Sequence, residues 1–154
     1  MKNFIWKFLP FNELSNNQLY SVLALREEVF EIEQNCIYQD LDFQDQMAIH
    51  ILCLDSSKES NDGLAAYCRV FTTNAERSEA VIGRVIVNKN YRSQKLGYEL
   101  MNKVIEFLKS KGEAKIKIAA QAHLKRFYEN LGFVWISDDY DLDGIPHLDM
   151  RLVV

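Results

Sequence analysis

Cysteine is scarce in this 154-residue sequence: Cys36, Cys53 and Cys68 are an odd number, and no two have Cys-x-x-Cys spacing. A disulfide framework is therefore disfavoured, and we expect three small, buried thiols in a reducing cytoplasm. Long apolar runs are also missing, because the hydrophobic N-terminal stretch is interrupted by Lys7 and ended by Pro10. That stretch is too short for a signal peptide or a membrane span, so we expect no membrane partner.

The chain has no excess of basic residues. Its formal net charge is -4, whereas a general nucleic-acid binder is usually basic, so we expect no nucleic-acid partner. A local basic site remains compatible with this charge, because net charge averages over the whole surface. Internal repeats, low-complexity tracts and long linkers are absent, so we expect one domain over residues 1–154, as a monomer or a homodimer.

Recognisable metal motifs are absent as well. Counted from Asp40, a calcium-binding loop needs Gly at its sixth position and Glu at its twelfth, but Asp45 and Ile51 stand there. We therefore expect no metal, since the spacing of zinc ligands is also missing among His50, Cys53 and Cys68.

An acidic loop follows the first expected helix. It contains Asp40, Asp42 and Asp45. We interpret these aspartates as solvated surface, or as a mild preference for a cationic amine substrate.

Hydrophobic periodicity predicts an α/β fold with a mixed sheet and the element order β-α-β-β-β-α-β-α-β-β. The expected strands are 4–8, 48–54, 64–72, 80–87, 115–120 and, roughly, 134–140 and 147–153. The expected helices are 16–30, 97–111 (ended by Gly112) and 122–131 (ended by Gly132). A hairpin-like connection over 55–63 ends in Asp-Gly.

The first helix has a clear start signal. Ser15 is placed as its N-cap, and Gln18 three residues later completes a capping box. Arg26 falls on the expected apolar face, where it either extends its charged end to solvent or anchors a nearby carboxylate. Both interpretations stay open. The apolar residues of that face are Leu19, Val22, Leu23 and Phe30.

The stretch VIVNKNYRSQKLGYELM, residues 85–101, is typical of a strand, a polar turn and a helix. The first amides of a helix lack intrahelical partners and the helix dipole is positive there, so such a junction can hold a phosphate. Arg92 and Lys95 add charge, and Gly97 lies on the buried face, where a missing side chain permits close approach to the sheet. The phosphate-loop lysine motif and the dinucleotide glycine fingerprint are absent. Taken alone, this segment favours a solvated basic turn with a packing glycine.

Together, RVIVNKNYRSQKLGYELM and the later FYENLGF resemble the GNAT superfamily of acetyl-CoA-dependent N-acetyltransferases, whose signature is Arg/Gln-x-x-Gly-x-Gly/Ala after a central strand. LREEVFEIEQNCIYQDLDFQD with DGIPHLDM is similar to its ElaA-type subgroup. The resemblance covers essentially the whole chain. It implies a single domain with a mostly antiparallel central sheet flanked by helices, acetyl-CoA as co-substrate, and a small-molecule or peptide amine as acceptor.

By position, the resemblance implies that backbone amides of one loop hold the CoA pyrophosphate, namely those of Arg92, Ser93, Gln94, Lys95, Leu96 and Gly97. It implies that the pantetheine and acetyl group are lined by Val85, Ile86 and Val87, with a strand N–H polarising the thioester carbonyl. Tyr98 begins the helix beside the phosphates, and Gln121 stands where the family often has a CoA-contacting asparagine. Tyr128 matches the family's general acid, although without the motif it would be interpreted as a core tyrosine.

One residue departs from the family signature, because Lys95 stands where the first glycine belongs. A glycine there permits unusual backbone angles and close approach to a phosphate. A lysine can replace it only with ordinary backbone angles, as in a first helical turn, and would then offer its ammonium to the diphosphate in compensation. Weaker CoA binding than is usual in the family would follow.

Acetyl transfer needs a neutral amine, a donor for the oxyanion and a proton for the departing thiolate. The strand glutamate that often serves as base in the family is replaced here by Ile116. Glu33 and His50 rank first as substitutes, because the ElaA-type resemblance runs through both and a histidine titrates near neutral pH. His123 and His147 are further candidates. For each of the four, a solvated or locally hydrogen-bonded side chain is the simpler interpretation.

Two alternative functions stay open. The spacing of Arg26 and Phe30 suggests an activity like that of acyl-homoserine-lactone synthases, although that family lacks a clear match to FYENLGF. Because Ile116 replaces the strand glutamate and Lys95 replaces the first motif glycine, a non-catalytic acyl-CoA-binding regulatory module is the second alternative.

Overall fold

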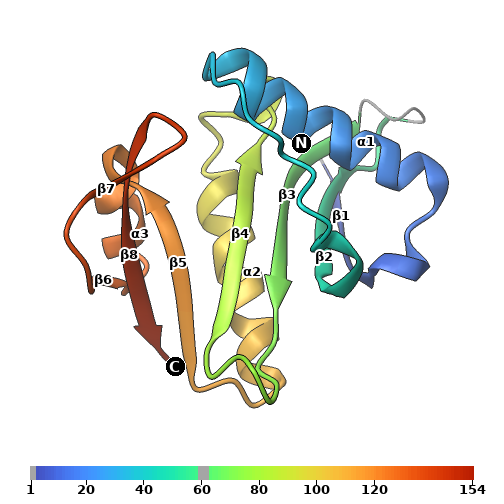
Figure 1. Ribbon diagram of the computed structural model, residues 1–154. Coiled ribbons are helices and arrows are strands. Elements are labelled where there is room, and N and C mark those ends of the chain that lie inside the picture. The colour runs from blue at the N-terminus through green and yellow to red at the C-terminus, as the bar shows by residue number, and fades with distance from the viewer. Residues whose placement is uncertain (1–2, 59–62) are drawn as a thin grey trace.

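The computed structural model describes residues 3–58 and 63–154. Among them, eight strands form one sheet in the order β1-β2-β3-β4-β5-β8-β6, with β7 paired to β8 (Figure 1). Every neighbouring pair is antiparallel except β4 and β5, which are parallel. The predicted α/β class, with a mixed and mostly antiparallel sheet flanked by helices, is confirmed.

The first half of the sheet is a meander of four strands: β1 (Phe4–Pro10), β2 (Ile49–Asp55), β3 (Leu64–Phe71) and β4 (Ala80–Val87). β3 is buried along its whole length, as expected of a strand covered on both faces. The four strands predicted for this half are confirmed to within about two residues. The predicted connection over 55–63 lies partly outside the described residues.

The second half begins with β5 (Lys115–Gln121), which pairs with β8 (Ile145–Val153). The short strands β6 (Val134–Trp135) and β7 (Tyr140–Leu142) both pair with β8. The single strand predicted over 134–140 is therefore wrong. The residues between β6 and β7 read Ile-Ser-Asp-Asp, and serine and aspartate favour turns because their side chains bond to nearby backbone groups.

The helix α1 (Asn16–Arg26) begins at the predicted N-cap. Ser15 Oγ accepts from the Gln18 N–H at 3.0 Å, and Gln18 Oε1 accepts from the Ser15 N–H at 2.9 Å, so the capping box is confirmed. The chain continues as a π-helical segment, Glu27–Glu33.

The side of α1 that faces the sheet overlaps with the predicted one. Val22 is buried and Phe30 packs against the same apolar cluster, whereas Leu19 and Leu23 are only half-buried. Arg26, which was expected on this side, lies at its centre. The buried residues of α1 and the π-helical segment are Val22, Leu25, Arg26 and Val29.

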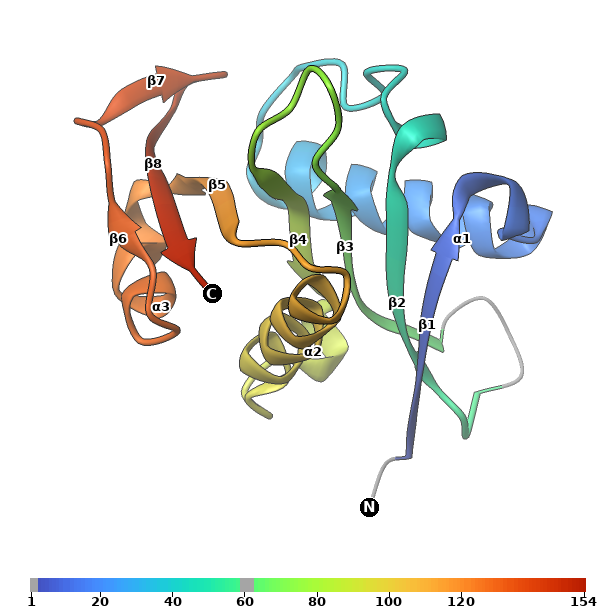
Figure 2. The same ribbon diagram turned by 90° about the horizontal axis from the view of Figure 1, so that it is seen from below.

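The helices α2 (Leu96–Ser110) and α3 (Lys125–Glu129) cover the face of the sheet opposite α1 (Figure 2). Gly112 and Gly132 end the helices with φ of 83° and 96°, which confirms both predicted stops. The buried residues of α2 are Leu96, Leu100, Met101, Val104 and Leu108. Short 3-10 helices span Phe11–Glu13, Asp45–Met47, Lys89–Tyr91 and Ala122–Leu124.

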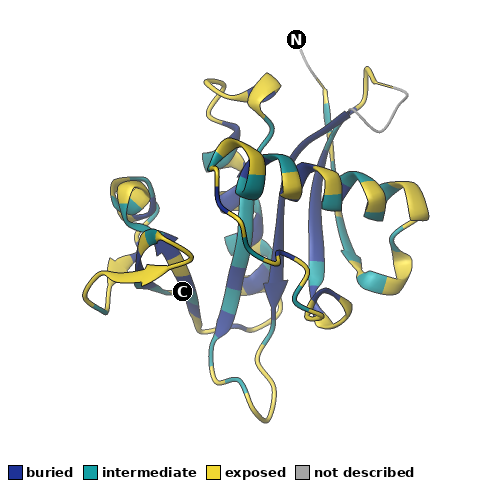
Figure 3. Ribbon diagram, turned by 45° about the horizontal axis from the view of Figure 1, so that its top comes forward, coloured by how far each residue is buried: buried dark blue, intermediate teal, exposed yellow. Residues whose placement is uncertain are grey.

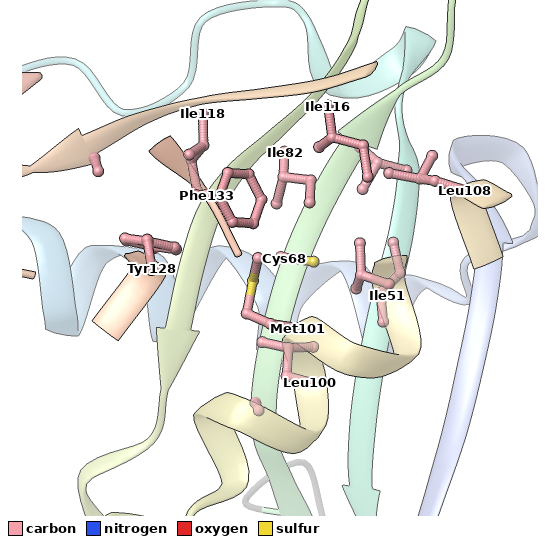
Figure 4. Packing of buried hydrophobic residues seen from close by; sticks show 14 of the residues in the cluster. Ile51, Cys68, Ile82, Leu100, Met101, Leu108, Ile116, Ile118, Tyr128 and Phe133 are labelled. Atoms are coloured by element: carbon pink, nitrogen blue, oxygen red, sulfur yellow. The ribbon is translucent and has the colours of Figure 1, made fainter. Parts of the chain in front are cut away.

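Two apolar clusters hold the layers together. The larger lies between the sheet and α2 and α3, and Figure 4 shows Tyr128 at one end of its labelled residues. The smaller packs α1 onto the other face and contains Val22, Leu25, Val29, Leu52, Leu64, Tyr67 and Ile86.

Burial is concentrated in the central strands, while β6 and β7 are largely exposed (Figure 3). The three cysteines are free thiols and are buried, as predicted. Within the described part of the chain, no helix has the length and apolar character needed to cross a membrane.

Candidate active site

The strands β4 and β5 separate after a short parallel contact. Their pairing is limited to residues 80–82 of β4 and residues 116–118 of β5, although β4 continues to Val87 and β5 to Gln121. Figure 1 shows the two strands diverging beyond this contact. The main-chain groups on the facing edges of the two strands therefore lose their ladder partners along the gap.

The Val87 N–H points into this gap. The neighbouring Asn88 N–H bonds to Ala65 O on the β3 side at 2.8 Å, so Val87 and its partner Ala66 form a pair of the non-hydrogen-bonded type. The N–H and C=O of Val87 are thus directed away from β3. Arg92 Nε donates to Val87 O at 3.0 Å from that side. A main-chain donor is therefore presented on the β4 wall of the gap.

A β-bulge in β4 precedes this donor. The two β4 residues Arg84 and Val85 lie opposite the single β3 residue Cys68, between the register pairs on either side. Arg84 has φ 54°, in the left-handed region that side chains rarely adopt. A bulge bends the strand that contains it, which accounts for the departure of β4 from β5.

The start of α2 is uncapped, in contrast to that of α1. Its N-cap residue, Lys95, has φ 56° and ψ 21° and makes no side-chain capping hydrogen bond. The condition of ordinary backbone angles is therefore not met at Lys95. Lysine takes the left-handed conformation that favours glycine, at a cost of about 1–2 kcal/mol. The first amides of α2 lack intrahelical partners, so they are suited to an external acceptor such as a phosphate.

Two adjoining cavities lie along the β4–β5 gap and the loop before α2, with volumes of about 650 Å³ and about 310 Å³. Among the residues predicted to bind CoA, the larger cavity is lined by Val85, Ile86, Val87, Arg92, Gly97 and Gln121. The smaller is lined by Val87, Arg92, Ser93, Lys95, Leu96, Gly97 and Tyr98. Gln94 lines neither cavity. The structure thus brings residues 85–87 of β4 and the loop before α2 together along the two adjoining cavities.

Gly97 lies where the two cavities meet, and it lines both. A Cβ added there would lie 3.4 Å from the Phe127 ring and 3.7 Å from Val87 Cγ2, which are ordinary contacts. The helix therefore approaches β4 and Phe127 closely at Gly97, as expected, although a methyl group would still fit. The missing side chain also leaves space in the cavities. Phe127 lines both cavities too, but no local sequence signal pairs it with Gly97.

Arg92 is already engaged by protein groups. Besides its bond to Val87 O, it donates Nη2 to Glu33 Oε2 at 2.8 Å. Glu33 ends the π-helical segment and lines the larger cavity. The pair therefore spans the gap from the α1 side to the loop before α2, and the predicted anion-binding arginine and predicted base are in direct contact.

Tyr128 lines the larger cavity from α3 and is only 4% exposed. Its ring makes edge contacts with Phe127 and Phe133, at centroid distances of 4.9 Å and 5.9 Å. Burial raises the pKa of Tyr128, with a smaller contribution from Cys68. The phenol is therefore held protonated at neutral pH, as a proton donor requires.

The predicted bases are placed very differently. Glu33, His123 and His147 line the larger cavity. His50 does not: it is fully buried, with Nε2 donating to Asp45 O at 2.8 Å and Nδ1 accepting from Tyr67 Oη at 2.7 Å. Burial lowers the pKa of His50, so the ring stays neutral and structural.

Ile116, which replaces the family's strand glutamate, is a fully buried core residue. It offers no group for proton transfer. His147 has Nδ1 2.8 Å from Ile145 O. Because a carbonyl oxygen only accepts, Nδ1 carries the proton in the neutral ring and Nε2 is the basic nitrogen.

Two contacts bridge the cavity from the α1 side to the opposite wall. Gln34 and Gln121 exchange side-chain amide hydrogen bonds of 3.3 Å and 3.2 Å. Cys36 Sγ donates to Asp143 O at 2.9 Å. All four residues line the larger cavity. These contacts tie the segment after α1 to the end of β5 and to the turn between β7 and β8.

The acidic loop is not solvated as predicted. Two of its aspartates, Asp40 and Asp45, are buried, and Arg26 of α1 binds both of them. The interpretation of Arg26 as a carboxylate anchor is therefore confirmed.

Two strand arginines complete this network. Arg69 of β3 binds Asp45 at 2.8 Å and Asp42 at 2.5 Å, and Arg84 of β4 binds Asp40 at 2.7 Å. The charges of the aspartates are thus matched by arginines. The interpretation of the loop as a preference for cationic substrates loses its basis.

Sequence reasoning missed Arg69 and Arg84, both of which line the larger cavity. The signal that could have found them is their position inside the apolar strands LAAYCRVF and AVIGRVIV. An arginine within a buried strand needs a carboxylate partner. The three aspartates of the loop were the available partners.

The family of the chain follows from its relatives. Residues 57–154 match the family of acetyltransferase (GNAT) domains. The chain belongs to the GNAT acyltransferase family. Within it, the chain is 42% identical over 148 residues to protein ElaA of Escherichia coli (strain K12), with 94% of each sequence covered.

Solved structures agree with this assignment. The crystal structure of Escherichia coli ElaA matches with a TM-score of 0.86 at 39% identity, covering 97% of this chain and 99% of that one. An acyl-CoA N-acyltransferase from Pseudomonas aeruginosa matches with a TM-score of 0.88 at 32% identity, covering 98% and 100%. The predicted resemblance to the GNAT superfamily and its ElaA-type subgroup is confirmed.

Proposed function

We propose that this protein transfers the acetyl group of acetyl-CoA to a primary amine of a small molecule or peptide, by direct attack of the neutral amine on the thioester. One observation carries the proposal: the Val87 N–H faces the β4–β5 gap, in the cavity that Tyr128 also lines. A donor for the oxyanion and a donor for the departing thiolate thereby share one cavity, and both are needed for acetyl transfer.

Residues along the two cavities bind different parts of acetyl-CoA. The uncapped start of α2, from Lys95 to Tyr98, binds the pyrophosphate through its amides. Val85 and Val87 contact the pantetheine arm on the α2 side of β4, while Ile86 packs on the α1 side. A pantetheine amide displaces one partner of the Gln34–Gln121 pair. The thioester supplies the acetyl group. The acceptor ammonium gives up its proton to a base, and Tyr128 gives a proton to the departing thiolate.

Glu33 and His147 remain as candidate bases, because both line the cavity. One carboxylate oxygen of Glu33 is occupied by Arg92. Nε2 of His147 is left as an acceptor by the bond that its Nδ1 makes. Either group would take a proton from the acceptor ammonium, directly or through a water. His50 is dropped as a candidate, since both of its ring nitrogens are bonded in the core.

The two alternative functions lose support. The Arg26 side chain, which suggested an activity like that of acyl-homoserine-lactone synthases, is fully buried and bonded to Asp40 and Asp45. It therefore does not contact a substrate. A non-catalytic module would not require a buried, protonated phenol in the cavity, so Tyr128 favours the enzyme.

The first experiment is calorimetric titration with acetyl-CoA. We expect saturable binding by the wild-type protein and its loss in Gly97→Trp, because the indole would fill the junction of the two cavities. Lys109→Trp, at an exposed position of the same helix, serves as the control for an added tryptophan. Release of CoA thiol is then followed across a panel of amines. A wild-type protein that binds no acetyl-CoA, or binds it and acetylates no amine, would contradict the proposal.

A further inference from the structure

A charged donor in the cavity wall lacks a partner. Arg69 is 5% exposed, and its Nε is buried without a hydrogen-bond acceptor among the described residues. Its two Nη atoms are bonded to Asp42 and Asp45. A buried donor without an acceptor is costly, and the cost is greater for a charged group. A ligand acceptor in the cavity would remove that cost.

The cavity is open at Gly83, the residue that lies next to this donor. A Cβ built on Gly83 would lie 3.9 Å from Arg69 Nε, and apart from its own chain neighbours no other atom of residues 3–58 and 63–154 lies within 4 Å. Gly83 and Arg69 both line the larger cavity. The missing side chain therefore leaves room for a ligand atom beside Gly83, and a small rotation of the buried Arg69 guanidinium would bring its Nε to that atom.

A second guanidinium lies one residue further along β4. Arg84 donates Nε to Asp40 Oδ1 at 2.7 Å and Nη2 to Asp40 O at 2.9 Å, and it also lines the cavity. Its Nη1 has no hydrogen-bond partner within the described part of the chain. Two arginines that line the larger cavity and share Asp42 as a partner thus each carry a donor without a protein acceptor in the described part of the chain.

We infer that the acceptor amine carries a carboxylate, and that this group binds beside Gly83 against the guanidinium groups of Arg69 and Arg84. The inference rests on the proposed acetyl transfer and names its substrate class as amino acids or similar amino carboxylates. Carboxylate oxygens are strong acceptors for guanidinium donors. In the reaction, the amine nitrogen bonds to the acetyl carbon, the thioester C–S bond breaks, and the thiol leaves with a proton.

The loop aspartates favour selection of a carboxylate by short-range hydrogen bonds, because they cancel most of the long-range attraction of the arginines for anions. They balance the charges of Arg26, Arg69 and Arg84 and hold the guanidinium groups in fixed orientation. Recognition then depends on hydrogen bonds at short range. Fixed donors lose little side-chain entropy when a ligand binds, so they discriminate between a carboxylate and a neutral amide.

The test compares matched acceptors. A series of α- and ω-amino acids of increasing length is assayed by CoA thiol release, each against its own carboxamide. We expect kcat/KM to be roughly tenfold or more higher for the free carboxylate, the effect of a lost charge-assisted bond. Equal or better turnover of the carboxamides would overturn the inference while leaving the proposed function intact. Bound acetyl-CoA with no amine acetylated would overturn both.

Two variants locate the carboxylate. Gly83→Ala adds one methyl group in open space, so we expect an unchanged melting temperature and unchanged acetyl-CoA affinity, but a several-fold smaller preference for carboxylates. Arg84→Gln removes the second donor and should reduce the preference further, with Lys109→Gln, exposed at the far end of α2, as its control. A folded Gly83→Ala protein with the full wild-type preference would overturn the placement beside Gly83.

Discussion

Arg26 Nη1 lies 2.7 Å from Asp45 Oδ1, and the same oxygen accepts from Arg69 Nη1 at 2.8 Å. One carboxylate oxygen therefore joins α1 to β3. Asp40 joins α1 to β4 through its two oxygens, with Oδ2 bound to Arg26 and Oδ1 bound to Arg84. The loop between the first helix and the second strand thus links three elements of the fold, and two of its arginine partners also form the wall of the cavity.

Arg26→Leu tests the contribution of this network to stability. Removing one partner of a buried ion pair leaves uncompensated charge, which costs about 3–5 kcal/mol. We expect the free energy of unfolding in urea to fall by about that amount. Lys89→Ala breaks the exposed pair with Glu28 and should cost at most about 1 kcal/mol. A similar loss of unfolding free energy in the two variants would mean that the buried network contributes no more to stability than the exposed pair.

The same network predicts an acid-dependent loss of stability. Hydrogen bonds from Arg69 hold the pKa of Asp42 well below its usual range, against the opposing effect of partial burial. The folded state therefore binds fewer protons than the unfolded state, in which an aspartate has a pKa of about 3.9. The stabilisation is complete above about pH 4 and is lost as pH falls through the folded-state pKa.

Urea unfolding over a range of acidic pH measures this effect. We expect the decline of unfolding free energy below about pH 4 to be shallower in Asp42→Asn than in the wild type, because that carboxylate no longer titrates. Asp139→Asn, at an exposed position, should keep the wild-type slope. Parallel declines in all three proteins would exclude Asp42 as a source of the acid sensitivity.

The sequence predicted most of the fold because the central strands and α2 have regular apolar patterns. Ser15 and Gln18 marked the start of α1, and Gly112 and Gly132 marked the ends of two helices, since these signals act over a few residues. The strand expected over 134–140 failed because two turn-forming aspartates interrupt it. Local pattern could not show that β6 and β7 both pair with β8, which depends on long-range register.

The candidate site was predicted less completely. The loop before α2 and Tyr128 were found through the family motif, and both line the cavities. His50 failed as a base because its partners, Asp45 and Tyr67, come from different elements. Charge alone suggested a solvated acidic loop, whereas Arg69 turns its aspartates into bonded partners. Such pairings are tertiary contacts, and no periodicity in one segment reveals them.

Lys95 offers a test of backbone strain that separates conformation from charge. Lys95→Ala removes the ammonium but keeps a side chain at φ 56°, whereas Lys95→Gly removes both. We expect the glycine variant to be more stable than the alanine variant by up to about 1 kcal/mol. Acetyl-CoA affinity, measured by calorimetry, should fall in both variants if the ammonium contacts the diphosphate. Wild-type affinity in Lys95→Ala would remove that compensating role.

The pH dependence of turnover separates the two candidate bases. Replacing the base with glutamine should lower kcat by about 10²–10⁴-fold and abolish the acidic limb of the rate profile. We therefore compare His147→Gln with Glu33→Gln, each with acetyl-CoA affinity measured in parallel. A variant that weakens acetyl-CoA binding but keeps the acidic limb has lost a structural contact, as Glu33 would through Arg92. Full activity in both variants would mean that the amine arrives neutral.

Tyr128→Phe tests the proton donor most directly. Its hydroxyl is the only group removed, so packing against Phe127 and Phe133 is kept. We expect kcat to fall by about 10²–10⁴-fold with little change in acetyl-CoA affinity, because general-acid catalysis acts in the transition state. Tyr20→Phe, on the exposed side of α1, is the matched control. Since burial raises the pKa of Tyr128, wild-type activity should show no alkaline loss from this group up to about pH 10. A Tyr128→Phe protein with wild-type kcat would show that the thiolate leaves without this proton.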